Sequence, residues 1–141
     1  MQTTATFRLH GDSGLRTAAA VSSRLGLSPT RAEEAGWIRN PRRPRPRDAS
    51  LWALDSSAEI ETGVELAEQL HRLLDQLEPV KEQLWELANE GYQANWFCYV
   101  ESNALEHAVE LDRETLTRLL ALPGDVRLDV CGDELFEAPT P

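Results

Sequence analysis

A chain of 141 residues that is 41% hydrophobic and 27% charged has the size and composition of one globular domain. No run approaches the roughly 18 consecutive apolar residues of a membrane span, and the start lacks the cationic and apolar regions of a secretory signal, so we expect a bacterial cytoplasmic protein. Of the formal net charge of −10, residues 1–47 contribute nine arginines against three acidic residues, whereas residues 48–141 hold five basic and 21 acidic ones. This uneven distribution of charge bears on association with charged partners and gives no information about the fold.

The N-terminal part of the chain predicts a strand followed by a helix. Apolar and polar residues alternate over residues 4–10, which is the period of a strand with one buried face. The segment Gly11-Asp12-Ser13-Gly14 then breaks the chain and offers Asp12 or Ser13 as a helix cap. We expect a short helix over residues 15–25, with Ala18, Val21 and Leu25 inside and Gly26 as its end.

The next segment is rich in arginine and proline. Residues 31–50 show no periodicity, and three prolines in the run Arg39–Arg47 exclude a helix, so we expect a loop over residues 39–50. Residues 51–55 predict a short second strand.

A long amphipathic segment dominates the middle of the chain. Its apolar residues recur at spacings of three and four, which places them on one helical face that must be buried. They are Leu66, Leu70, Leu73, Leu77, Val80, Leu84 and Leu87. Pro79 lies inside this pattern, so we expect two helices or one kink there, with Gly91 as the end.

The C-terminal part predicts strand, helix and strand. Residues 92–101 carry aromatic or apolar groups on both faces, which is typical of a central strand. Asp112 caps the next helix, whose inner side we expect to consist of Leu116, Leu119, Leu120 and Leu122. Residues 126–130 predict the last strand, and residues 137–141 a short flexible tail.

The order of elements predicts a single α+β domain over residues 1–141. Without the long helices the elements read strand, helix, strand and again strand, helix, strand, which is the order of a ferredoxin-like two-layer sandwich. The long kinked helical segment would be an insertion between the second and third strands. A mixed α/β sheet is the alternative.

Several phrases of the sequence resemble one protein family. They are residues 5–12 (ATFRLHGD), 25–32 (LGLSPTRA), 51–54 (LWAL), 74–79 (LDQLEP), 119–122 (LLAL) and 125–130 (DVRLDV). Together, in this order and over nearly the whole chain, they are similar to a bacterial family catalogued as domain of unknown function 4279. The resemblance implies one compact stand-alone α+β domain and supplies no catalytic residue.

We find no constellation that indicates catalysis or metal binding. Cys98 and Cys131 lack the spacing of a zinc site and read as strand residues, and His10, His71 and His107 are scattered. We therefore expect no catalytic residues, no metal and no cofactor, and do not expect an enzyme.

Four glutamates form what we call the glutamate ladder: Glu78, Glu82, Glu86 and Glu90. Like charges four residues apart on a helix repel by roughly 0.2 to 0.5 kcal/mol per pair. The ladder is either a solvated helix face or a docking surface for a cationic partner. Trp85 lies beside it and could either pack at the edge of the core or serve as an exposed anchor for that partner.

The arginine-rich run offers secondary binding candidates: Trp37, Arg39, Arg42, Arg43, Arg45 and Arg47. The run could lie over the domain with arginines paired to carboxylates, bind nucleic acid, or present a polyproline ligand. The acidic remainder of the chain argues against nucleic acid. We read Trp52 and Trp96 as core residues.

These features favour a non-enzymatic protein-binding module, most concretely an acidic immunity-type inhibitor of a basic toxin or enzyme. We keep two alternatives, namely a ligand-sensing or accessory domain with a cleft between the sheet and the inserted helices, and an unrecognised enzyme. A protein partner that is basic is expected, and a membrane partner is not.

Overall fold

A computed structural model of the chain describes residues 2–12, 14–57, 61–102 and 108–132. One mixed sheet has the strand order β2-β3-β1-β5-β6, and β4 pairs with one end of β1. The strands are β1 (Gln2–Gly11), β2 (Arg31–Glu33), β3 (Ser50–Asp55), β4 (Glu61–Thr62), β5 (Gln93–Ser102) and β6 (Asp125–Gly132). The helices are α1 (Ala18–Leu25), α2 (Leu66–Leu77), the 3-10 turn η1 (Glu78–Val80), α3 (Lys81–Asn89) and α4 (Arg113–Leu120). No helix of the described residues is long and apolar enough to span a membrane.

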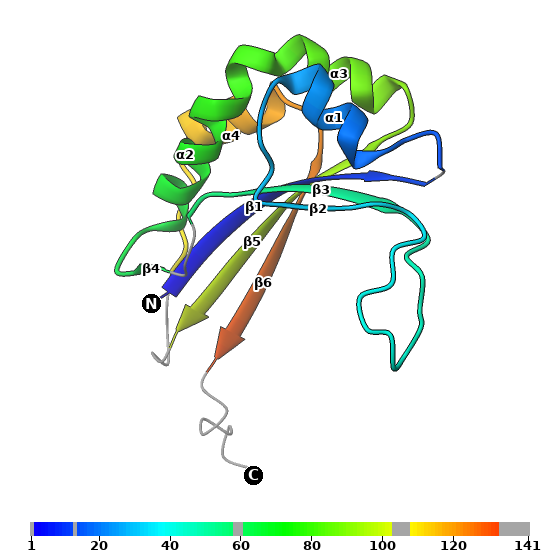
Figure 1. Cartoon of the computed structure of the whole chain (residues 1–141). Coiled ribbons are helices and arrows are strands. Elements are labelled where there is room, and N and C mark those ends of the chain that lie inside the picture. The colour runs from blue at the N-terminus through cyan, green and yellow to red at the C-terminus, as the bar shows by residue number, and fades with distance from the viewer. Residues whose placement is uncertain (1, 13, 58–60, 103–107, 133–141) are drawn as a thin grey trace.

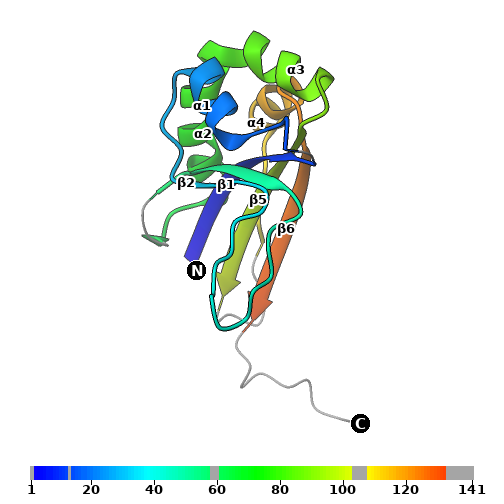
Figure 2. The same cartoon turned by 45° about the vertical axis from the view of Figure 1, so that its right-hand side comes forward.

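The helices lie together on one side of the sheet, as Figures 1 and 2 show. β1 and β5 form the centre, and their inward side chains alternate with outward ones as expected from their sequences. Phe7 and Trp96 are both buried on the helix side, with ring centroids 4.8 Å apart. The core therefore lies between the sheet and a single helix layer, and the opposite sheet face carries no helix among the described residues.

The long helical segment folds as its leucine spacing predicts. Leu70, Leu77 and Leu84 are fully buried, and burial of each leucine side chain contributes about 1.5 to 3 kcal/mol. Pro79 lies in η1, where the chain passes from α2 into α3, because proline cannot supply the N–H of a continuous helix. Gly91 follows α3 at φ +112°, a backbone conformation that favours glycine.

The first helix differs from its expected start. Ala18, Val21 and Leu25 are buried and Gly26 ends the helix as predicted, but α1 begins at Ala18 rather than at residue 15. The cap is Thr17, whose side chain accepts from the Ala20 N–H, and Asp12 instead forms an ion pair with Arg16 at 2.8 Å. Ser13, the other expected cap, lies outside the described residues. Residues 31–33, expected as irregular chain, form β2.

The predicted inner face of the last helix, α4, is wrong in two of its four leucines. Asp112 caps α4 as expected, and Leu119 and Leu122 are buried. Leu116 and Leu120 are exposed, the latter at 82%. The eight-residue helix packs on α2 and buries only a narrow stripe, so neighbouring leucines remain outside it.

The fold is α+β, but the ferredoxin-like order is not confirmed. A split β-α-β unit places its first two strands parallel with a third strand between them. Here β1 and β3 are directly paired and antiparallel, and β5 and β6 are directly paired and parallel. The segment between α1 and β3 includes β2 and a long loop, so the chain reverses direction instead of crossing over.

Candidate functional site

The glutamate ladder lies on the outer side of η1 and α3, but three of its members are paired within the chain. Arg24 of α1 contacts Glu86 at 3.0 Å and Glu90 at 2.8 Å. Arg118 of α4 contacts Glu78, and it also contacts Asp75 at 2.8 Å. Two single arginines, each from a neighbouring helix, thus relieve the repulsion along the ladder.

These ion pairs lie at the surface and leave the carboxylates accessible. The side chains of Glu86 and Glu90 are more than half exposed despite Arg24. The hydrogen bond from Arg24 lowers the pKa of Glu90 and raises that of the guanidinium. Exposed ion pairs contribute little to stability, so a partner's cation can compete with Arg24 at little cost.

Trp85 lies beside the ladder and is held in a defined orientation. Its indole Nε1 donates to the carbonyl of Ala121 at 2.8 Å, while 39% of the residue stays exposed. The ring borders a surface hollow of about 560 Å³. The hollow is also lined by Ala88, Gln93, Ala94, Asn95, Pro123, Gly124 and Asp125. An aromatic ring, small apolar residues and polar residues, among them Asp125, therefore line the hollow at the end of α3.

The arginine-rich loop lies on the other side of the molecule. Figure 2 shows the loop that joins β2 to β3 on the side of the sheet away from the helices. Arg47 contacts Glu33 at 2.7 Å, whereas Arg39, Arg42, Arg43 and Arg45 are exposed. Trp37 is 43% exposed. The loop therefore does not cover the glutamate ladder, although one of its arginines is paired with a carboxylate.

The open face of the sheet gathers arginines around an aromatic ring. The Arg8 guanidinium lies 4.4 Å from the ring centre of Phe97, and its Nε donates to Asn95 at 3.0 Å. Burial, followed by the charges of Arg31 and Arg127, lowers the pKa of Arg8. Arg8, Arg31 and Arg127 thus lie near one another on the open face, where the Asp55 carboxylate partly offsets their charge.

The histidines and cysteines occupy separate places in the fold. His10 lies on the open face, where burial and the charges of Arg8 and Arg47 lower its pKa. His71 on α2 contacts Thr115 on α4, and His107 lies outside the described residues. Burial raises the pKa of the Cys98 thiol to about 11, which leaves it protonated and unreactive at neutral pH. Cys98 and Cys131 are strand residues, as expected.

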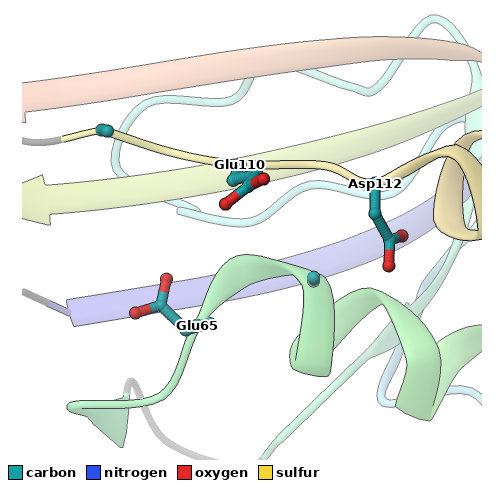
Figure 3. A pocket seen from close by; sticks show the side chains of 5 residues that line it. Glu65, Glu110 and Asp112 are labelled. Atoms are coloured by element: carbon teal, nitrogen blue, oxygen red, sulfur yellow. The ribbon is translucent and has the colours of Figure 1, made fainter.

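Three carboxylates surround a second hollow, at the start of α2. Glu65, Glu110 and Asp112 point into the space between α2 and residues 108–112 (Figure 3). Asp112 is engaged as the α4 cap, and hydrogen bonds from the Thr115 side chain and backbone lower its pKa. In the part of the chain that the structure describes, no group of histidine, cysteine and carboxylate side chains could hold a metal ion.

Sequence reasoning selected Trp85 and the ladder but missed Arg24, Arg118 and Asp125. The two arginines lie in the last turns of α1 and α4, where a basic residue already favours the helix dipole. Their partners lie more than 35 residues away, and only the packing of α1 and α4 against the long helices brings them together. Asp125 carries no local signal, since it is simply the first residue of a strand.

Comparison with known proteins gives one match. A family model described as "Domain of unknown function (DUF4279)" matches residues 1–132. Neither the curated proteins nor the solved structures yield a match to this chain. Because the matched region spans almost the whole sequence, the chain belongs to the DUF4279 family.

Proposed function

We propose that this protein is a non-enzymatic protein-binding module that captures a basic protein at the Trp85 hollow and the neighbouring glutamates. Its most concrete form is an immunity-type inhibitor of a basic toxin or enzyme in the bacterial cytoplasm. The observation that carries the proposal is the hollow itself, in which an exposed, hydrogen-bonded tryptophan lies on an acidic helix, with Asp125 among the lining residues.

The lining of the hollow suits a lysine or arginine side chain of the partner. The aliphatic stem of such a side chain would pack on Ala88, Ala94 and Pro123. Its cationic end would meet the Trp85 ring, and a cation over an indole is the most favourable cation–π pair. A fixed aromatic residue in a hollow is also the usual composition of an interface hot spot.

The acidic helices would supply the long-range attraction. Glu82 precedes Trp85 by one helical turn and is exposed, and Glu86 and Glu90 keep accessible oxygens. Complementary charge of this kind raises association rates, and the effect declines as salt screens it. Arg24 would act as an internal placeholder that a partner's cations replace.

The proposal is tested by affinity capture from the native host with tagged full-length protein. Trp85→Ala and Asp125→Asn are compared with the wild type, and the captured partner is then purified for titration at low and high salt. We expect a protein of basic isoelectric point whose dissociation constant rises at least tenfold in Trp85→Ala. Association should slow at high salt.

Two matched variants separate the hollow from other surfaces. Trp37→Ala removes a tryptophan of similar exposure from the opposite side, and Glu68→Gln removes an exposed carboxylate at the other end of the long helical segment. Both should bind the partner as the wild type does. An acidic partner, or equal binding by the wild type and Trp85→Ala, would contradict the proposal.

A further inference from the structure

The last strand is an open edge of the sheet with an apolar side. Among the described residues β6 pairs only with β5, and its eight residues form one border of the sheet. Val126, Leu128 and Val130 are 46%, 49% and 61% exposed. Natural proteins usually shorten, cover or charge such edges because an open apolar strand pairs with other chains.

The apolar residues of β6 extend the helix side of the sheet. In the parallel register with β5, Val126, Leu128 and Val130 stand beside Trp96, Cys98 and Val100, which are buried under the helices. The helix layer therefore covers β5 and leaves β6 half covered. A neighbouring strand on the free edge would place its own side chains against this exposed strip.

Charged residues alternate along the other face of β6. Asp125, Arg127 and Asp129 point to the open face, where Arg127 stands beside Phe97 and Asp129 beside Tyr99. Phe97 already carries Arg8 on its ring, and the charge of Arg127 contributes to the lowered pKa of Arg8. An acidic group brought to the free edge at Arg127 would relieve this concentration of positive charge.

We propose that two copies of this chain pair through their β6 strands in antiparallel orientation, with Leu128 on the two-fold axis. In this register Val126 lies opposite the partner subunit's Val130, and Arg127 lies opposite the partner subunit's Asp129. The symmetry repeats both pairs, so the interface holds two complementary charge pairs on the open face and an apolar row on the helix side. One sheet then runs from β2 of one copy to β2 of the other.

The charge pattern selects this register over its neighbours. Side chains return to the same face every two residues, so alternative registers differ by slides of two. A slide of two in one direction places Arg127 opposite Arg127 and Asp125 opposite Asp129. A slide of two in the other direction places Asp129 opposite Asp129. Like charges directly opposite each other disfavour strand pairing.

A slide of four does not compete. In one direction it restores an Asp125–Arg127 pair, but only residues 125–127 of each β6 remain paired. In the other direction it pairs residues 128–132 and forms no charge pair. The register centred on Leu128 pairs seven residues, from Asp125 to Cys131, and places no like charges opposite each other. A self-complementary patch of this kind is what a two-fold interface requires.

Charge reversal and restoration test the pairing in the full-length chain. Sedimentation equilibrium should give twice the 15.8 kDa of the chain for the wild type. Arg127→Asp and Asp129→Arg each create two like-charge pairs and should raise the dimer dissociation constant at least tenfold. The double variant Arg127→Asp/Asp129→Arg restores both pairs in reversed order and should regain the dimer.

Several outcomes would overturn the proposal. The first is a wild type that remains monomeric at the highest soluble concentration, and the second is single variants that dimerise as the wild type does. The third is a double variant that stays monomeric although its circular dichroism and melting temperature match those of the wild type. The Trp85→Ala variant serves as a further control, because it alters the proposed partner site and should leave the dimer unchanged.

Cysteine cross-linking tests the register directly. In a Cys98→Ala/Cys131→Ser background, which also removes the thiol beside residue 128 in the same chain, Leu128→Cys would bring two thiols together across the axis at a Cα separation of about 4.5 to 5.5 Å, which suits a disulfide. Val126→Cys is the matched control, since its opposite residue is valine. We expect mild oxidation to cross-link the Leu128→Cys variant by itself. A mixture of the Val126→Cys and Val130→Cys variants should also cross-link, whereas Val126→Cys by itself should not. Rapid cross-linking of Val126→Cys by itself would contradict this register.

Discussion

His71 on α2 and Thr115 on α4 lie 44 residues apart in the chain, and their contact connects the two helices. The imidazole Nε2 and the threonine Oγ1 are 2.7 Å apart, and Thr115 is completely buried. The Thr115 hydroxyl and backbone N–H also donate to Asp112, which caps α4. The hydroxyl is therefore shared between Asp112 and His71. One buried hydroxyl thus fixes the cap of α4 and its position on α2.

Replacing Thr115 by valine should destabilise the protein. The variant keeps the shape of the side chain but removes the hydrogen-bond partner of His71 Nε2 and the hydroxyl contact to Asp112, which together cost about 1 to 3 kcal/mol. Urea unfolding followed by circular dichroism measures the difference. Thr117→Val is the matched control, because Thr117 lies in the same helix, is exposed and donates only to the carbonyl of Arg113. Equal midpoints for the two variants would show that the contact to His71 contributes nothing.

Truncating a leucine of the long helical segment and truncating an exposed leucine of α4 should change the free energy of unfolding by different amounts. Leu70→Ala removes a fully buried side chain from the long helical segment and should cost about 2 to 5 kcal/mol. Leu120→Ala removes a leucine that is 82% exposed and should change the free energy of unfolding by no more than about 0.5 kcal/mol. Denaturant midpoints compare the two directly. A large loss in Leu120→Ala would mean that α4 buries a face other than the observed one.

Periodicity predicted the parts of the fold that bury a continuous face. The leucine spacing over residues 66–87 and the alternation in β1 both correspond to buried rows, because helix and strand geometry impose those periods directly. The inner face of α4 was predicted wrongly because four leucines within residues 116–122 fit several helical faces, and only tertiary packing selects one. Strand order was not predictable from local patterns, since β1 pairs with β3 and β5 through contacts that cross the whole chain.

The candidate site was predictable only in part. The spacing of the glutamates placed them on one helical side, and Trp85, which the sequence left open between core flank and exposed anchor, is 39% exposed. The pairing of Arg24 with Glu86 and Glu90 could not be inferred, because it depends on how α1 lies beside α3. For the same reason Asp125 became a candidate only when β6 was seen to begin beside α3.

Gly11 should tolerate no side chain, although its backbone is not in the left-handed region. A Cβ at this position would overlap the carbonyl oxygen of Arg16 and lie 2.7 Å from Oγ of Ser50. That hydroxyl accepts from the Gly11 N–H and donates to the Arg16 carbonyl, so the whole turn would have to shift. We expect Gly11→Ala to cost about 1 to 3 kcal/mol.

Gly14 provides the control for this substitution. It lies in the same turn, and a Cβ there would meet no atom within 4 Å. Gly14→Ala should therefore leave the melting temperature close to that of the wild type. Thermal unfolding of both variants tests the contrast, and a Gly11→Ala protein that melts with the wild type would rule out the close approach of β1 to Arg16.

The contribution of Arg24 to stability should depend on pH in a defined direction. The hydrogen bond from Arg24 lowers the pKa of Glu90 in the folded protein. A carboxylate with a depressed folded pKa stabilises the fold above its unfolded pKa, and this stabilisation is lost as the pH falls through the folded value. Arg24→Gln should therefore lower the melting temperature at neutral pH, and the difference from the wild type should shrink in acid. Arg45→Gln removes the same charge from the exposed loop and controls for the change in net charge. A difference between Arg24→Gln and Arg45→Gln that stays constant down to the acid transition would show that the pairing of Arg24 with Glu90 does not stabilise the folded state.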